Sequence, residues 1–173
     1  MRTLILSGLV VLSMFVAGLN PALSQTLEQA KTAQVERALS TAQGKQIKAS
    51  VEKYSKMYRV DKNLIYAIIL TESGFRQYAG SNAGCKGLMQ LAPLTFKARK
   101  VGNNIYDIDQ NIHGGVRHFA GLIGRYKGNT LFALAAYNAG GGRVPVGGPM
   151  PSYSRKYVNR VMYHKHIIEK MKL

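Results

Sequence analysis

TESGFRQYAGSNAGCKGLMQ, residues 71–90, follows directly on the apolar run NLIYAIIL of residues 63–70. Because that run is apolar on most faces of a helix, we expect a central, buried helix from Asn63 to Ser73, with Asp61 as its N-cap. The segment beyond it is small, polar and rich in glycine, and it turns apolar again at Gly87-Leu88-Met89-Gln90. The rest of the chain is expected to be arranged around this helix and the loop that leaves it.

Glu72 stands in the last turn of the expected helix, where the negative end of the helix dipole favours cations over carboxylates. If apolar neighbours also remove it from water, both effects favour the protonated carboxyl and raise its pKa. A carboxyl that keeps its proton near neutral pH can act as a general acid. The alternative from position alone is a solvated surface glutamate at a frayed helix end.

Apolar residues at helical spacing predict further helices, and no segment of useful length has the period of a strand. The fold class is therefore expected to be mostly α. Residues 25–46 are expected to be a linker or a loosely docked N-terminal helix, with Leu27, Ala30, Gln34 and Ala38 along one side. The other helices are expected at residues 45–58, 93–99, from Asp109 or Asn111 to about Tyr126, at 131–137 and at 152–173.

Several motifs resemble those of a known family in their order along the chain. Glu72-Ser73-Gly74-Phe75, then Ser81 and Gly84-x-x-Gly87-Leu88-Met89-Gln90, are similar to the first two motifs of the lytic transglycosylase domain of the soluble (family 1) type. Ala136-Tyr137-Asn138-Ala139-Gly140 resembles the third motif, and Tyr157-Val158 the fourth. The resemblance covers about residues 47–161 and implies a lysozyme-like catalytic domain, which we place at residues 47–173.

The resemblance also implies a mechanism with one carboxyl group. In this family a single Glu protonates the oxygen between N-acetylmuramic acid and N-acetylglucosamine, then takes the proton of the C6 hydroxyl as a 1,6-anhydro ring closes. Carried over by position, that residue is Glu72. The motif matches further imply an apolar floor of Leu88 and Met89 below Glu72 and an orienting hydroxyl on Tyr157. The resulting substrate-binding set is Ser81, Met89, Gln90, Tyr137, Asn138 and Tyr157.

Departures from the family pattern occur at two places. Leu91-Ala92-Pro93 has Ala where the family usually has Met, and Ser152-Tyr153-Ser154 stands where Glu-Thr often precedes the fourth-motif Tyr. Both changes concern the shape of the sugar subsites more than the catalytic group.

Acidic residues are scarce, with eight Asp and Glu in the whole chain. A hydrolase that activates water ordinarily needs a second carboxylate, and only Asp107 and Asp109 lie where one could serve. Two alternatives to a transglycosylase therefore stay open: a hydrolase of the same fold that uses Asp107 or Asp109, and a protein that binds peptidoglycan without cleaving it.

The N-terminus and the charge indicate where the protein works. Residues 1–24 read as a secretory signal peptide, with Arg2 before an apolar stretch and small residues before Gln25. We expect export to the periplasm or beyond, with no membrane association after the signal is removed. The formal net charge of +16 favours polyanionic partners. After export, peptidoglycan strands are a more accessible partner than nucleic acid, and a secretion, conjugation or pilus machine is expected by analogy.

No cofactor or metal is expected. The four histidines show no spacing with carboxylates or cysteine that would form a metal site. The segment GGGRVPVGGPMP of residues 140–151 lacks the Lys-Ser/Thr ending of a phosphate-binding loop and is expected to form the lip of a groove or a plain connector. The single cysteine, Cys85, has no partner for an internal disulfide and is expected to be a small buried residue.

Overall fold

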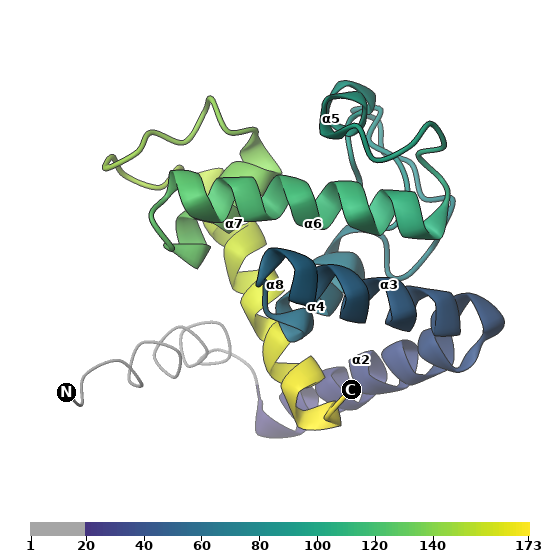
Figure 1. Cartoon of the computed structure of the whole chain (residues 1–173). Helices are drawn as coiled ribbons and strands as arrows, with labels where there is room; N and C mark the ends of the chain where they lie inside the picture. Colours follow the sequence, from purple (N-terminus) through teal and green to yellow (C-terminus); the bar gives the residue numbers. More distant parts are fainter. Residues whose placement is uncertain (1–19) are drawn as a thin grey trace.

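The structure is a computed structural model that describes residues 20–173 (Figure 1). Most of the expected signal peptide, residues 1–19, lies outside the described part. Within residues 20–173 the regular elements are seven α-helices, and the only β-type pairing is a pair of isolated bridges, Gly80 with Lys86 and Lys86 with Leu91. The expectation of a mostly α fold is confirmed. The helices are α2 (Pro21–Ser40), α3 (Ala42–Tyr58), α4 (Lys62–Glu72), α5 (Pro93–Arg99), α6 (Ile108–Arg125), α7 (Thr130–Ala139) and α8 (Ser152–Met171).

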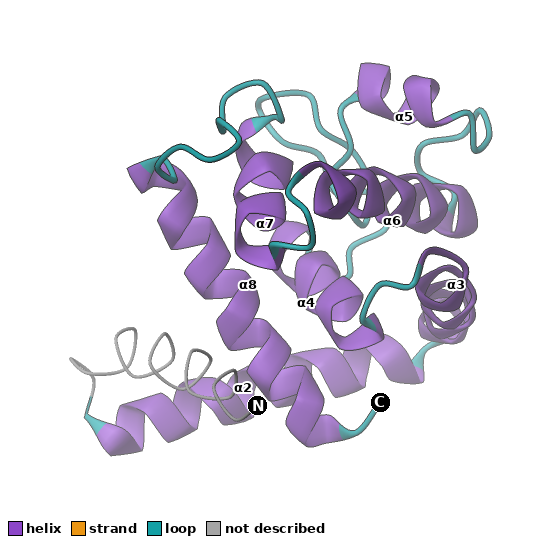
Figure 2. Cartoon of the chain, turned by 60° about the vertical axis from the view of Figure 1, so that its left-hand side comes forward, coloured by secondary structure: helices purple, strands orange, loops and turns teal. Residues whose placement is uncertain are grey.

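Helix α4 is the centre of the core. Every side chain from Leu64 to Leu70 is buried, so this short helix is apolar all round and must be covered on all sides. Its N-cap is Asp61, whose side chain accepts a hydrogen bond from the backbone N–H of Asn63 at 2.9 Å, as the sequence predicted. Figure 2 shows α4 between α8 and α3, and it packs against both.

The remaining helices close the core around α4. Helix α6 lies along α3, and α7 packs between α6 and α8 (Figures 1 and 2). The long connection between α4 and α6, which contains the short helix α5, lies over α6 in both views. No helix among the described residues is long and apolar enough to cross a membrane.

The N-terminal segment forms helix α2, which packs against α3 and α8. Its buried residues are Val35 and Leu39, at 0% and 2% exposure. Leu27, at the start of the side noted from the sequence, is 44% exposed. Only the second half of α2 lies on the core, so the buried pair is confined to its last two turns.

The start of α6 also differs from the sequence prediction. The N-cap is Asp107, whose Oδ1 accepts from the backbone N–H of Gln110 at 2.9 Å, and the helix begins at Ile108. We had expected Asp109 or Asn111 to be the cap. Both have other partners: Asp109 binds side chains of α3, and Asn111 is buried against the loop that follows α4.

Candidate active site

Glu72 is the last residue of α4, and its carboxyl group is mostly withdrawn from solvent. Burial raises the pKa of Glu72 from 4.5 to about 7, against the opposing effects of a hydrogen bond from Tyr157 and the positive charge of Arg160. At neutral pH a substantial fraction of the molecules therefore carry the proton on Glu72. A carboxyl with a pKa near the working pH can both give and take a proton in one catalytic cycle.

Tyr157 supplies the hydrogen bond to this carboxyl. It lies on α8, is 4% exposed, and its hydroxyl donates to Oε1 of Glu72 at 2.6 Å. Because Tyr157 sits in the first two turns of α8 and packs in the core, its hydroxyl has little freedom to move. The bond fixes one oxygen of Glu72 and favours the charged form, which limits how far burial raises the pKa.

A second contact joins α8 to the residue before Glu72. The hydroxyl of Thr71 donates to the carbonyl of Ala67 at 2.7 Å and lies 2.8 Å from Nδ1 of His164. With the hydroxyl proton directed at Ala67, the ring nitrogen of His164 is the donor in the second bond. Burial, with Lys31 and Arg160 nearby, lowers the pKa of His164 to about 4, so the ring is neutral at pH 7. Two consecutive residues at the end of α4 are thus held by α8.

The loop after α4 is fixed to α6 by Asn111, a side chain that is 1% exposed. Its Oδ1 accepts from the backbone N–H of Met89 at 2.8 Å, and its Nδ2 donates to the carbonyls of Ile105 at 2.7 Å and Lys86 at 3.2 Å. Gly87 has φ +80°, and a Cβ there would stand 2.2 Å from Nδ2 of Asn111. Only glycine satisfies both the backbone conformation and the close approach.

Two of the expected substrate-binding residues, Gln90 and Ser81, form hydrogen bonds within this loop. Nε2 of Gln90 donates to the carbonyls of Ala79 and Gly87, each at 3.0 Å. Ser81 is exposed, and its hydroxyl accepts from the backbone N–H of Cys85 at 3.1 Å. Gln90 and Ser81 therefore hold the shape of the loop, while Ser81 also faces solvent.

Met89 and Leu88 lie in the core, at 0% and 1% exposure. A Cβ on Gly115 would stand 2.3 Å from the sulfur of Met89, so the side chain of Met89 packs directly on α6. The carbonyl of Met89 accepts from the hydroxyl of Tyr137 on α7 at 2.8 Å. Burial and the nearby Glu72 carboxylate raise the pKa of Tyr137 well above 10. Tyr137 thus connects α7 to the loop close to Glu72, and Asn138 next to it is exposed.

Asp107 and Asp109, the candidates for a second carboxylate, are engaged elsewhere. Asp107 caps α6. Asp109 accepts hydrogen bonds from Ser50 at 2.9 Å and Tyr54 at 2.6 Å, which tie α6 to α3. Partial burial acts to raise the pKa of Asp109, but these hydrogen bonds and the charge of Lys53 hold it below its ordinary value. Both carboxylates have structural partners, and the structure gives neither a contact with Glu72.

Sequence reasoning missed Arg160, His164, Thr71 and Asn111. Arg160 and His164 follow Tyr157 by three and seven residues, a spacing that places all three on one side of a helix. That spacing was a usable signal once Tyr157 had been singled out. Asn111 had no such signal, because its partners are backbone groups of residues 86, 89 and 105.

The arrangement brings one carboxyl with a raised pKa and its tyrosine partner together at the end of a buried helix, where a polar loop begins. This set can transfer one proton to a leaving oxygen and take one back. It resembles the machinery of acid–base catalysis by a single carboxyl rather than a pair of carboxylates.

Comparison with known proteins agrees with this geometry. The family described as Transglycosylase SLT domain matches residues 49–146. The membrane-bound lytic murein transglycosylase F of Desulfosudis oleivorans is 39% identical over 100 residues, which is 54% of this chain and 22% of that protein. A transglycosylase of Enterobacteria phage PRD1 is 36% identical over 107 residues, or 62% of this chain and 40% of the phage protein. The chain thus spans about a fifth of the first of these relatives and two fifths of the second.

Solved structures show the same fold. An inactive mutant of the lytic transglycosylase Slt from Pseudomonas aeruginosa matches with a TM-score of 0.64 at 28% identity, over 72% of this chain and 24% of that one. The 70 kDa soluble lytic transglycosylase of Escherichia coli matches with a TM-score of 0.66 at 23% identity, over 72% and 24% of the two chains. The expected lysozyme-like, mostly α fold is confirmed by these matches.

Proposed function

The chain belongs to the transglycosylase SLT domain family, and we propose that it is a peptidoglycan lytic transglycosylase. The reaction is cleavage of the β-1,4 bond between N-acetylmuramic acid and N-acetylglucosamine, with formation of a 1,6-anhydromuramoyl end. The observation that carries the proposal is the state of Glu72: a single carboxyl with a pKa raised to about 7 and one oxygen bound to Tyr157.

Glu72 performs both proton transfers of the proposed reaction. In the first, its proton moves to the bridging oxygen as the bond from that oxygen to C1 of the muramoyl residue breaks. In the second, the resulting carboxylate takes the proton of the muramoyl C6 hydroxyl while the C6 oxygen bonds to C1. The two proton transfers balance, because Glu72 is protonated again at the end of the reaction, and no water is consumed. The Tyr157 hydroxyl stabilises the carboxylate between the two transfers.

We further propose that Ser81, Gln90, Tyr137 and Asn138 contact the glycan. The exposure of Ser81 and Asn138 supports a direct contact. Met89 and Tyr157 are buried, so we propose that they shield the Glu72 carboxyl from water and do not contact the glycan directly. In this arrangement the apolar side chains desolvate the carboxyl, and the polar ones position the sugar.

The hydrolase alternative has less support, because Asp107 and Asp109 both have structural partners. A binding protein without turnover is also less favoured, since burial of a carboxyl at the negative end of a helix costs free energy that binding alone does not require.

The cellular role extends the same proposal. A signal peptide would export the protein to the periplasm, where the strong positive charge that stays after removal of the signal and its Arg2 draws it to anionic wall material. Local opening of the wall for a secretion, conjugation or pilus machine is the role that we propose there, by analogy with small enzymes of this kind.

Mass spectrometry of the muropeptides released from purified peptidoglycan tests the proposed activity. The protein should produce anhydromuramoyl ends, and Glu72→Gln should produce none while still sedimenting with peptidoglycan. Reducing muramoyl ends would show a hydrolase. Binding without cleavage by the unmodified protein would show a binding protein.

A further inference from the structure

A pocket opens in the segment that follows the catalytic helix. It has a volume of about 440 Å³ and is lined by Gln43 at the start of α3 and by residues 75–80. Phe75 and Arg76 follow Glu72 by only three and four positions, so this pocket lies close to the end of α4. The contacts described above for Glu72 do not use any of its lining residues.

The walls of this pocket are held by side-chain hydrogen bonds across three segments. Nε2 of Gln43 donates to Oε1 of Gln77 at 2.8 Å, and Nε2 of Gln77 donates to the carbonyl of Tyr106 at 2.9 Å. These bonds tie α3, the loop after α4 and the segment before α6 together. A pocket that is held in this way is already formed before a ligand arrives, which reduces the entropy lost on binding.

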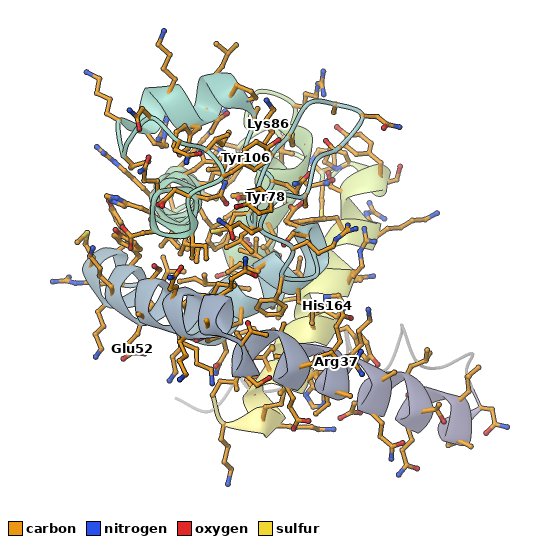
Figure 3. The ribbon with its side chains drawn as sticks, turned by 90° about the vertical axis from the view of Figure 1, so that its right-hand side faces the viewer. Arg37, Glu52, Tyr78, Lys86, Tyr106 and His164 are labelled. Atoms are coloured by element: carbon orange, nitrogen blue, oxygen red, sulfur yellow. The ribbon has the colours of Figure 1, made fainter. Side chains whose placement is uncertain are left out.

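Tyr78, which lines the pocket, is followed by a second tyrosine and a lysine outside it. Tyr78 is 72% exposed, and its ring centre lies 5.8 Å from that of Tyr106. Nζ of Lys86 lies 5.7 Å from the Tyr106 ring centre. Figure 3 shows Tyr78, Tyr106 and Lys86 following one another on this face of the molecule. An aromatic side chain exposed to this extent beside a preformed pocket is a common feature of binding surfaces.

The basic side chains of this surface form no ion pairs with carboxylates of the described residues. Arg76 is exposed, and its Nε donates to the carbonyl of Ser73 at 3.0 Å, which fixes the guanidinium beside the end of α4. Within residues 20–173, all ion pairs are made by Lys53, Lys56, Lys62, Lys165 and Lys170. Arg76 and Lys86 therefore have no carboxylate partner in the described part of the chain, and both are available to an anionic ligand.

We propose that Arg76, Tyr78, Lys86 and Tyr106 bind the acidic stem peptide that hangs from a muramoyl residue of the substrate. This inference rests on the proposed function. The glycan itself is uncharged where its lactyl groups carry peptides, so the carboxylates of such a strand lie on the peptides. Two unmatched cations beside two tyrosine rings fit a short peptide with free carboxylates better than they fit a neutral sugar.

The short sequence separation between Glu72 and Arg76 makes this contact feasible. Arg76 follows Glu72 by four positions, so their Cα atoms lie at most about 14 Å apart, at about 3.3–3.6 Å per residue. An extended peptide of about four residues spans the same distance. A stem peptide attached near the reacting sugar can therefore reach Arg76 while the glycosidic bond lies at Glu72.

The test compares three glycan strands of one length: with stem peptides bearing free carboxylates, with the same peptides amidated, and without peptides. For the unmodified protein, amidation should lower kcat/KM by about two- to tenfold, the range expected for one or two partly exposed charge pairs. The double variant Arg76→Ala/Lys86→Ala should remove this difference, and Tyr78→Ala should reduce it. Lys97→Ala, which removes an exposed cation of α5, should preserve it.

The other outcomes distinguish a failure of the stem-peptide site from a failure of the proposed function. Equal cleavage of free and amidated strands by the unmodified protein would overturn the stem-peptide site while leaving the proposed function in place. Equal losses on all three strands in the double variant would also overturn it and assign the surface to the glycan. No cleavage of any strand by the unmodified protein would instead reject the proposed function.

Discussion

The hydroxyl of Tyr157 donates to Oε1 of Glu72 at 2.6 Å, although the two residues are 85 positions apart in the chain. The bond joins the first turns of the last helix to the end of the central one. Removal of the hydroxyl takes away the interaction that stabilises the charged carboxyl, so the pKa of Glu72 should rise above its value of about 7.

Tyr157→Phe should therefore move the alkaline limb of the pH–rate profile to higher pH. Since Glu72 also loses the contact that orients it, kcat at the optimum should fall by about tenfold, which corresponds to roughly 1.4 kcal/mol. Steady-state rates between pH 5 and 10 measure both effects. Tyr153→Phe, at an exposed position of the same helix, is the matched control. An unshifted alkaline limb in Tyr157→Phe would show that the bond does not set the pKa of Glu72.

Glu72→Gln should change how stability depends on pH. The folded protein holds the Glu72 proton more tightly than the unfolded chain, with a pKa of about 7 against 4.5. This contribution to stability is fully present below about pH 4.5 and is lost as the pH rises through 7. Glutamine cannot ionise, so the variant should be more stable than the parent at pH 9, by up to about 3 kcal/mol, and similar to it at pH 4. Denaturant unfolding at the two pH values checks this, and a difference that is independent of pH would contradict it.

Thr71 and His164 should act as one positioning unit for Glu72. Thr71→Val and His164→Leu each break the 2.8 Å contact between the end of α4 and α8. Each should lower kcat by about three- to tenfold with little change in KM, and the double variant should be no worse than the more damaging single one. His166→Leu, on the same helix, controls for the loss of an imidazole. Additive effects in the double variant would mean that the two residues act independently.

Asn111→Ala should loosen the loop that carries Ser81 and Gln90. The change leaves the buried backbone N–H of Met89 and the carbonyl of Ile105 without their hydrogen bonds. The carbonyl of Lys86 also loses its bond from Asn111 but keeps one from the backbone N–H of Leu91 at 3.0 Å. We expect a loss of about 2–4 kcal/mol in the free energy of unfolding, at about 1–3 kcal/mol for each buried group left unsatisfied and with partial relaxation. Thermal unfolding measures the loss. Asn103→Ala, at an exposed turn, should be close to neutral, and equal stability of the two variants would contradict the role of Asn111.

Asp107→Asn and Asp109→Asn should retain transglycosylase products. Asp109→Asn removes the charge that pairs with Lys53 and weakens the bonds from Ser50 and Tyr54, so its cost should appear in stability at neutral pH. Product analysis of both variants should still give anhydromuramoyl ends. Loss of product in either variant, with the fold intact by circular dichroism, would revive the mechanism with two carboxylates.

Much of the fold was predictable because it depends on local patterns. Asp61 caps α4, Pro93 starts α5, and the apolar spacing of Ile47, Val51 and Tyr54 marks the buried face of α3. The cap of α6 was predicted incorrectly, since three polar residues with similar cap propensity, at positions 107, 109 and 111, stand close together. Only their tertiary contacts distinguish them. Asp109 is hydrogen-bonded to α3, Asn111 is hydrogen-bonded to the loop after α4, and Asp107 caps α6.

The candidate site was predictable only in part. The position of Glu72 at the end of an apolar helix indicated a raised pKa. The motif resemblance, rather than any local pattern, implied that the Tyr157 hydroxyl orients Glu72, and the structure has that contact at 2.6 Å. The contact of Thr71 with His164 joins residues 93 positions apart, and no local pattern marks it. The same is true of the pocket that Tyr78 lines, because its walls come from two separate segments and a third holds them through Gln77.

Titration of the Glu72 carboxyl by carbon-13 NMR, with Glu72→Gln to assign the signal, tests the central claim most directly. On this claim, the Glu72 carboxyl keeps its proton near neutral pH, so that it can act first as an acid and then as a base. The predicted result is a titration midpoint of about 7 for Glu72. A midpoint near the ordinary value of 4.5 would leave Glu72 ionised at neutral pH, without the proton that the reaction needs, and would contradict the account.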